Sequence, residues 1–200
     1  MTASASVVRP RYDLDRVLGV AVDVFTERGY DGTSMEHLAS AAGLSKSSLY
    51  HHIDSKEQLL RLALERAVEP LYAVVEEPGA TTGAAVDRLA HVLRGTVHVL
   101  AEQLPYVSLL LRVRGNTDTE RWALEQRRAF DRVVASLVQQ AIDEGDLRAD
   151  LDARTTARLI FGTINSLAEW WRPGRGQADR DAMAVQVEQL VFRGLRSGRP

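Results

Sequence analysis

Residues 33–62 read TSMEHLASAAGLSKSSLYHHIDSKEQLLRL and predict two short helices around a turn at Gly43, followed by a third helix that begins at Ser55. Thr33 is a suitable N-cap for the first of these helices, with Glu36 three positions later as its capping-box partner. Gly43 stands where the end of a helix often requires a left-handed backbone. Two helices joined by so short a turn predict a helix-turn-helix.

The second short helix has only two large apolar residues. Leu49 and Ile53 lie about one turn apart, and Ser45 precedes them as a capping residue. The remaining residues are polar, basic or aromatic: Lys46, Ser47, Ser48, Tyr50, His51 and His52. A helix held by one apolar edge and otherwise covered with hydrogen-bonding groups is typical of the second, DNA-reading helix of this motif.

These residues resemble the N-terminal motif of the TetR family of transcriptional regulators. The family pattern is a Gly-Tyr-x-x-Thr-Ser lead-in, an Ala-Gly turn, a Ser/Thr-capped helix ending Leu-Tyr-x-His-Phe, and then Ser-Lys-Glu-x-Leu. Here the matching segments are Gly29-Tyr30-Asp31-Gly32-Thr33-Ser34, Ala42-Gly43-Leu44-Ser45, Leu49-Tyr50-His51-His52-Ile53 and Ser55-Lys56-Glu57-Gln58-Leu59. Ser47 replaces a common Gly and Ile53 replaces the usual Phe. The resemblance implies a homodimeric, DNA-binding regulator, most often a repressor.

The composition fits a protein of the reducing cytoplasm. The chain has 200 residues, 45% of them apolar, and no cysteine, which excludes disulfides and thiolate metal sites. We expect no cofactor, no metal site and no membrane helix, and the N-terminus lacks the apolar core of a signal peptide. Arg9 and Arg11 fit a flexible arm that reaches a DNA groove.

The net charge of −2 is unusual for a DNA-binding protein, because phosphate contacts favour basic surfaces. Between residues 40 and 56, however, the charged residues are two bases, Lys46 and Lys56, and one acid, Asp54. We therefore predict a local positive patch on an acidic body.

The rest of the chain predicts an all-α fold of about nine helices. An N-terminal three-helix DNA-binding domain, residues 1–60, is joined by a shared helix to a helical effector-binding and dimerisation domain, residues 61–200. The later helices are predicted at about 82–103, 106–113, 118–142, 151–171 and 179–195. Pro70 is predicted to kink or end the shared helix.

The resemblance implies that the Tyr50 hydroxyl and the Lys56 ammonium contact DNA phosphates, which position a protein without reading sequence. Lys46, Ser47 and Ser48 lie in the first turn of the second helix, where helix-turn-helix proteins touch base edges. The competing interpretations are a half-buried core aromatic at Tyr50 and an ordinary surface Lys56. The whole predicted contact set is Thr33, Ser34, Ser45, Lys46, Ser47, Ser48, Tyr50, His51, His52 and Lys56.

Capping alone accounts nearly as well for Thr33 and Ser34, and His51 and His52 can instead pack against the first helix.

Bulky residues of the middle helices predict an effector pocket, with a plain hydrophobic core as the competing interpretation. Asn165 interrupts an apolar run and can orient a ligand or bond a neighbouring helix. The predicted pocket residues are Leu100, Leu104, Tyr106, Leu110, Trp122, Phe130, Phe161, Ile164, Asn165 and Trp171. His91 and His98 make a poor metal site and are predicted to lie in the core or the pocket.

The segment 167–174 resembles the end of the eighth helix in TetR-type regulators that respond to acyl-coenzyme A or lipid-like effectors. Arg112, Arg114 and Arg121 could meet phosphates of such a ligand, although surface charge is the simpler interpretation.

The last two helices are predicted to form a four-helix dimer interface. Its residues would be Ala157, Ile160, Phe161, Ile164 and Ala168 on one helix and Val187, Leu190, Val191 and Leu195 on the other. A dimer with two-fold symmetry would place two reading helices in successive major grooves of a palindromic operator.

Three alternatives stay open at this point. An enzyme is disfavoured because the sequence has no Walker loop, HExxH or GxSxG motif. A small-molecule-binding or scaffold protein with a non-functional helix-turn-helix is opposed by the presence of Lys46, Tyr50 and Lys56. An activator would share the same architecture as a repressor.

Overall fold

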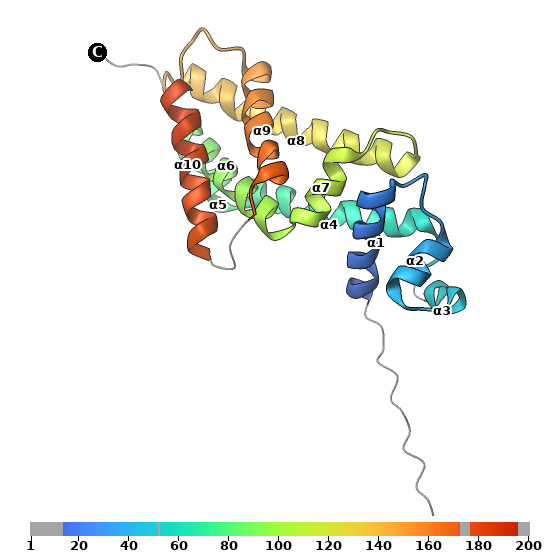
Figure 1. Ribbon diagram of the computed structural model, residues 1–200. Helices are drawn as coiled ribbons and strands as arrows, with labels where there is room; N and C mark the ends of the chain where they lie inside the picture. The colour runs from blue at the N-terminus through green and yellow to red at the C-terminus, as the bar shows by residue number, and fades with distance from the viewer. Residues whose placement is uncertain (1–13, 52, 173–176, 196–200) are drawn as a thin grey trace, which may run out of the picture. The chain divides into compact units, whose positions relative to one another are not determined.

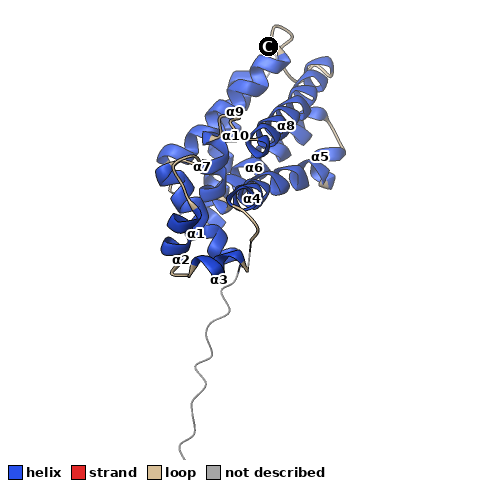
Figure 2. Cartoon of the chain, turned by 90° about the vertical axis from the view of Figure 1, so that its right-hand side faces the viewer, coloured by secondary structure: helices blue, strands red, loops and turns tan. Residues whose placement is uncertain are grey.

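The computed structural model describes residues 14–51, 53–172 and 177–195, which form ten α-helices and no strand (Figures 1 and 2). The predicted contacts of Arg9, Arg11 and His52 lie outside these residues. The chain divides into two compact units, residues 1–60 and 61–200. In the described part of the chain, no helix is long and apolar enough to cross a membrane.

The first unit is a three-helix cluster. It contains α1 (Leu14–Arg28), α2 (Met35–Ala42) and α3 (Lys46–Tyr50). Helix α2 packs against both α1 and α3. The core is formed by apolar side chains spaced at helical intervals, and it includes Leu18, Val22, Phe25, Leu38, Leu49, Ile53, Leu59 and Leu60.

Helix α4 (Lys56–Glu76) begins in the first unit, and its residues from Arg61 onward belong to the second. The helix continues through Pro70, so the prediction that Pro70 ends it is wrong. Proline removes one backbone donor from a helix. Buried Ala67, Val68 and Val74 hold the backbone in place on both sides of the proline.

The second unit contains six further helices, with α6 at the centre. They are α5 (Pro78–Thr81), α6 (Ala85–Glu102), α7 (Leu104–Arg112), α8 (Asp118–Asp143), α9 (Ala153–Trp170) and α10 (Gln177–Leu195). Helix α6 packs against α5, α8 and α10, and α8 packs against α9 (Figure 1). The tenth helix, absent from the predicted nine, is the short α5.

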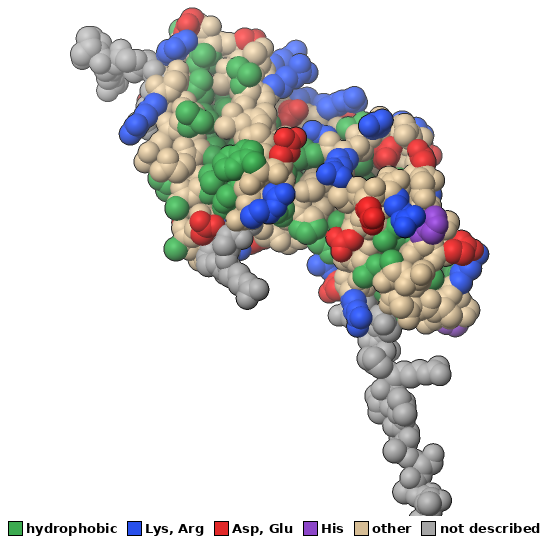
Figure 3. Space-filling view, viewed as in Figure 1, with side chains coloured by type: hydrophobic (Ala, Val, Ile, Leu, Met, Phe, Trp, Pro, Cys, Tyr) green, Lys and Arg blue, Asp and Glu red, His purple; other side chains and the backbone are tan. Residues whose placement is uncertain are grey.

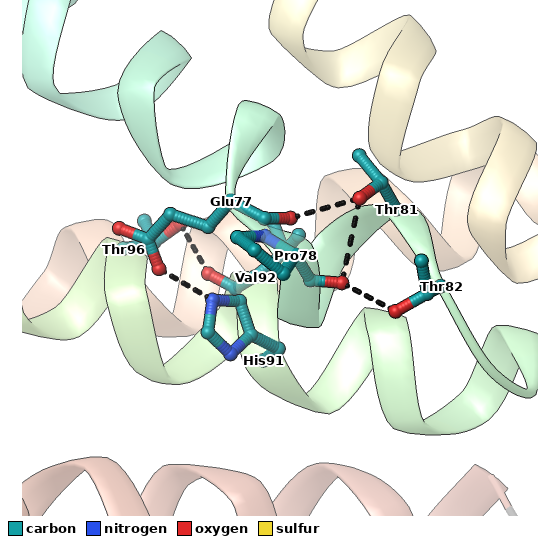
Figure 4. A network of polar contacts seen from close by, with 7 residues as sticks. All are labelled: Glu77, Pro78, Thr81, Thr82, His91, Val92 and Thr96. Carbon is teal, nitrogen blue, oxygen red and sulfur yellow. Dashed lines mark hydrogen bonds and ion pairs between the residues drawn. The ribbon is translucent and has the colours of Figure 1, made fainter.

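Helix α5 is a single turn held by local polar contacts (Figure 4). Thr82 Oγ1 donates to the Pro78 carbonyl at 2.8 Å, and Thr81 Oγ1 donates to the Glu77 carbonyl at 3.2 Å. The Glu77 carboxylate lies 2.7 Å from His91 Nε2 on α6. Side-chain contacts of this kind leave no apolar periodicity for a sequence pattern to detect.

Two ion pairs and one histidine–carboxylate contact connect α6 with α10. Arg94 pairs with Glu188 at 2.6 Å, and Arg180 pairs with Glu102 at 3.0 Å. His98 lies 3.1 Å from Asp181. His98 and His91 therefore face acids on neighbouring segments, and the prediction that they lie in the core or the pocket is wrong.

Large apolar side chains remain exposed on α9 and α10, and hydrophobic residues gather over these two helices in Figure 3. The four most relevant are Leu159 and Trp170 on α9 and Val185 and Leu190 on α10. By contrast, six of the predicted dimer residues are buried within the subunit, so that part of the interface prediction is wrong: Ala157, Ile160, Phe161 and Ile164 on α9, and Val187 and Val191 on α10.

Candidate nucleic-acid interface and effector cavity

The start of α2 differs from the prediction by one residue. Ser34, not Thr33, is the N-cap: its Oγ accepts the His37 N–H at 3.2 Å, and the His37 ring accepts the Ser34 N–H at 3.2 Å. Thr33 is 3% exposed, and its hydroxyl donates to the Gly29 carbonyl at 2.7 Å. Thr33 thus satisfies the end of α1, and its side chain is removed from the predicted DNA-contact set.

The turn between α2 and α3 has the predicted left-handed glycine. Gly43 has φ 67° and ψ 28°, and its N–H donates to the Ser40 carbonyl at 3.1 Å. The next N–H, of Leu44, donates to the Ala39 carbonyl at 2.9 Å. These bonds satisfy carbonyls at the end of α2 and bring α3 back against it.

Helix α3 is only five residues long, so it depends on its cap and its buried edge. Ser45 Oγ accepts the Ser48 N–H at 3.1 Å and also lies 3.0 Å from Ser47 Oγ. Leu49 and Ile53 are 0% and 2% exposed, as the sequence predicted. The polar residues of α3 therefore face solvent from a fixed helix.

Lys46 forms an ion pair with Glu36 across the turn. Both side chains are more than half exposed. The hydrogen bond between them lowers the pKa of Glu36 and raises the pKa of Lys46. The residue predicted to touch base edges is therefore held by an acid from α2 in the free protein.

Tyr50 is 45% exposed, so its side chain is not fully buried in the core. His51 is also exposed. Lys46 and Ser47 are exposed as well, so α3 and its C-cap present polar side chains to solvent.

Lys56 has a structural role that the sequence did not indicate. Its Nζ donates to the Tyr30 and Thr33 carbonyls, each at 2.8 Å, and lies 4.1 Å from the centre of the Tyr30 ring. These contacts fix the loop between α1 and α2. An ammonium has three N–H donors, so two carbonyl bonds are compatible with a third bond to a phosphate.

A cavity of about 280 Å³ lies in the second unit, between α4, α6, α7, α8 and α9. Five predicted pocket residues line it: Leu100, Leu110, Phe130, Phe161 and Asn165. Phe130 lies at the centre of an aromatic row, with ring centres 5.9 Å from Tyr72 and 5.4 Å from Phe161. The walls are therefore mainly apolar, as in typical small-molecule sites.

The other five predicted pocket residues lie elsewhere. The Arg61 guanidinium carbon of α4 lies over the Trp122 ring, 3.4 Å from the centre of that ring. Ile164 is in the core, on the inner face of α9, and Trp171 is buried at the C-terminal end of α9. Leu104 and Tyr106 are half-buried in the first turn of α7.

Three charged cavity residues were missed: Arg127 and Asp131 on α8, and Arg158 on α9. Burial lowers the pKa of Arg127 and raises the pKa of Asp131, although nearby opposite charges partly offset both effects. The signal in the sequence was the spacing of Arg127 and Asp131 around Phe130, which places all three on one side of α8. Arg112, Arg114 and Arg121 are not among the lining residues.

Helix α4 contributes to the cavity through Val68, Leu71 and Tyr72. The Tyr72 hydroxyl donates to the Gln126 carbonyl of α8 at 3.0 Å. A movement of α8 relative to α4 would therefore strain or break this hydrogen bond. Among the described residues, no group of three or more His, Cys, Asp or Glu side chains is arranged to hold a metal ion.

Two families match this chain. Residues 17–63 match the family described as bacterial regulatory proteins, tetR family, and residues 82–195 match the tetracyclin repressor-like C-terminal domain. A crystal structure of a TetR family transcriptional regulator from Streptomyces coelicolor A3 is 56% identical, with a TM-score of 0.85. That match covers 90% of this chain and 91% of the other.

Curated relatives agree with this result. The HTH-type transcriptional repressor KstR2 of Rhodococcus jostii is 27% identical over 184 residues, 90% of each chain. The fatty acid metabolism regulator protein of Bacillus subtilis is 24% identical over 191 residues, 94% of this chain and 97% of that protein. With its capped helix-turn-helix and its all-helical second unit, the chain belongs to the TetR family, whose members are DNA-binding transcriptional regulators and not enzymes.

Proposed function

We propose that this regulator is a cytoplasmic repressor that binds a palindromic operator in double-stranded DNA as a homodimer. A small, largely apolar effector would bind in the second-unit cavity and release the operator. The observation that carries the proposal is the position of α4, which begins at Lys56 beside the helix-turn-helix and lines the cavity through Val68, Leu71 and Tyr72.

The proposed DNA interface is the polar surface of α3. Lys46, Ser47 and Ser48 would meet base edges, and Tyr50 would donate to a phosphate. The exposure of Lys46 and Tyr50 supports this assignment and opposes a non-functional helix-turn-helix. Ser34, Ser45, His51, His52 and Lys56 complete the proposed set.

The proposed effector is a fatty-acid-like or acyl compound. The aromatic row of Tyr72, Phe130 and Phe161 offers an apolar wall, and Asn165 offers an amide. The name of the Bacillus relative, a fatty acid metabolism regulator, supports the same class.

The proposed release is a two-state equilibrium. An effector that separates α8 from α4 would act on the Tyr72 and Arg61 contacts and shift α4, and the paired α3 helices would lose the spacing of successive major grooves. By linkage, effector and operator must then weaken each other's binding by the same factor.

The test is fluorescence anisotropy with DNA from upstream of the chain's own gene, together with a thermal-shift screen of fatty acids, acyl-coenzyme A esters and aromatic drugs. We expect saturable, salt-sensitive DNA binding that falls when a stabilising ligand is added. Absence of double-stranded DNA binding, or a cavity ligand that leaves operator affinity unchanged, contradicts the proposal.

A pair of neighbouring variants tests the cavity. Asn165→Ala should lower the affinity for the effector by about tenfold without changing operator affinity, because one buried hydrogen bond to the effector is lost. Ser166→Ala is the matched control, since Ser166 is exposed and its hydroxyl donates to the Thr163 carbonyl of its own helix.

A further inference from the structure

Helix α10 carries two exposed apolar side chains, Val185 and Leu190, but its own attachment to the subunit is uneven. Its buried residues all lie in the second half of the helix and are Ala184, Val187, Val191 and Phe192. No residue of the segment 177–183 is buried. The first two turns of α10 therefore lack the apolar face that normally holds a helix on its domain.

Polar contacts with α6 take the place of that apolar face, and the two helices lie side by side (Figure 1). The contacts form a polar seam that consists of Arg94, His98 and Glu102 on α6 and Glu188, Asp181 and Arg180 on α10. The α6 residues recur every four positions and so lie in one row along the helix. Their partners follow in the opposite order along α10, so the two helices are antiparallel along the polar seam.

Arg180 holds the beginning of α10. Its Nη1 donates to Glu102 Oε1 at 3.0 Å, and its Nη2 donates to Gln177 Oε1 at 3.1 Å. The guanidinium therefore connects the last residue of α6 with the first residue of α10. Two turns earlier on α6, Arg94 Nη1 donates to Glu188 Oε2 at 2.6 Å.

The polar seam also fixes the direction of the exposed apolar side chains of α10. Val185 lies between Arg180 and Glu188, and both of these residues are bonded to α6. Release of Arg180 would let the first turns of α10 move, because no buried side chain retains them. An apolar contact with a second copy needs close packing, so a displaced Val185 would contribute little to it.

We propose that Arg94, Glu102, Arg180 and Glu188 are positioning residues of the homodimer. Their ion pairs fix α10 on α6 and thereby align the apolar outer side of α10 with a second copy of the chain. This inference rests on the homodimer of the proposed function. It makes an association between apolar surfaces depend on charges that lie within each subunit.

Charge reversal tests the polar seam at the pair of Arg180 and Glu102. Arg180→Glu and Glu102→Arg should each raise the dimer Kd by about tenfold or more, because two like charges then face each other. The double variant restores an ion pair, and its Kd should return to within about threefold of the unaltered value. Analytical ultracentrifugation with fluorescence detection measures Kd.

The matched control is an exposed ion pair away from α10. Arg132 and Glu125 pair with each other within α8, so Arg132→Glu and Glu125→Arg should leave the dimer Kd unchanged. Circular dichroism checks that every variant is folded. If Arg180→Glu does not fold, Arg180→Gln removes the attraction without adding repulsion and should raise the Kd by about threefold.

Salt distinguishes an ion pair from a contact that acts only through its shape. Screening weakens the attraction between Arg180 and Glu102, so about 0.5 M sodium chloride should raise the dimer Kd of the unaltered chain. The same salt should lower the Kd of Arg180→Glu, in which it screens the repulsion between two carboxylates. The double variant should respond to salt as the unaltered chain does.

Single reversals that leave the dimer Kd unchanged overturn the positioning role, and the homodimer of the proposed function then stands without it. A double variant that stays as weak as the single variants also overturns it, because the two side chains would then not act as a pair. An unaltered chain that is monomeric throughout contradicts the proposed homodimer itself, and this inference falls with it.

Discussion

At the scale of single residues, the Lys46 ammonium lies between two possible partners. In the free protein it pairs with Glu36 from α2, and on DNA it would face phosphates and base edges. Because the pair is exposed, Lys46 can exchange the Glu36 carboxylate for an anionic group of DNA, and breaking the pair lowers the net free energy gained on binding. Glu36 would therefore act as an internal competitor of the operator.

Glu36→Gln should raise operator affinity by about threefold to tenfold at low salt, because the competing carboxylate is removed. The slope of log K against log salt should become steeper by about one, because the surface that would face DNA becomes more positive by one charge. Anisotropy titrations over a salt series measure both effects. Asp118→Asn, which removes the acid of an exposed pair in the second unit, should change neither, and an unchanged slope for Glu36→Gln would refute the competition.

Substitutions at Lys56 and Tyr50 should have different effects, because Lys56 holds a loop in place and Tyr50 lies on the surface. Lys56→Ala removes two bonds to loop carbonyls and should lower the free energy of unfolding by about 2 kcal/mol, together with operator affinity. Tyr50→Phe should lower operator affinity by up to about tenfold with no change in stability, because Tyr50 is exposed.

Urea denaturation and anisotropy on the same samples check this pair. If Lys56→Ala keeps full stability, the carbonyl contacts do not fix the loop. If Tyr50→Phe binds the operator normally, its hydroxyl is not a phosphate donor.

In the first unit, local sequence patterns predicted the turn, the cap and the buried residues, but not the contact partners of the two lysines. The Gly43 turn, the Ser45 cap and the buried Leu49 depend on spacings of a few residues, which the sequence displays directly. The partners of Lys46 and Lys56 lie ten to 26 positions away, where no periodic signal connects them. In the cavity, apolar Phe130 and Phe161 were predicted, but Arg127, Asp131 and Arg158 were missed because charge on a helix usually indicates solvent.

At the scale of elements, α9 depends on one cap whose strength varies with pH. The Asp152 carboxylate accepts the Thr155 N–H, and its hydrogen bonds with Thr155 lower the pKa of Asp152. Because the pKa is lower in the folded than in the unfolded state, this stabilisation is present above the ordinary carboxyl pKa. It is lost as the pH falls through the folded value.

Asp152→Ala should therefore lower Tm by about 2–4 °C at neutral pH. The difference from the unaltered chain should shrink as the pH falls below about 4. Thermal denaturation followed by circular dichroism at several pH values measures this. Asp150→Ala is the control for a nearby acid that starts no helix, and a difference for Asp152→Ala that does not change with pH would rule out the charged cap.

At the scale of the whole molecule, most of the side chains predicted for the dimer interface lie on the core-facing sides of α9 and α10. A helix of the proposed interface would have two apolar faces, one for its own core and one for a partner, and periodicity alone cannot distinguish them. Burial can: Ala157, Ile160 and Ile164 are inside the subunit, whereas Leu159 and Trp170 are 67% and 61% exposed. The exposed pair, with Val185 and Leu190 of α10, is the apolar surface that remains for a second copy (Figure 3).

Leu190→Asp should therefore convert the dimer into a folded monomer, because it places a charge in an apolar contact without disturbing the core of the subunit. Operator affinity should fall by at least about 100-fold, since each half-site must then bind alone. Light scattering after size-exclusion chromatography gives the mass, and circular dichroism confirms the fold. Val133→Asp, on the exposed side of α8, should remain a dimer, whereas Ile164→Asp should unfold because Ile164 is 1% exposed. A Leu190→Asp protein that stays dimeric and binds the operator normally would place the interface on another surface.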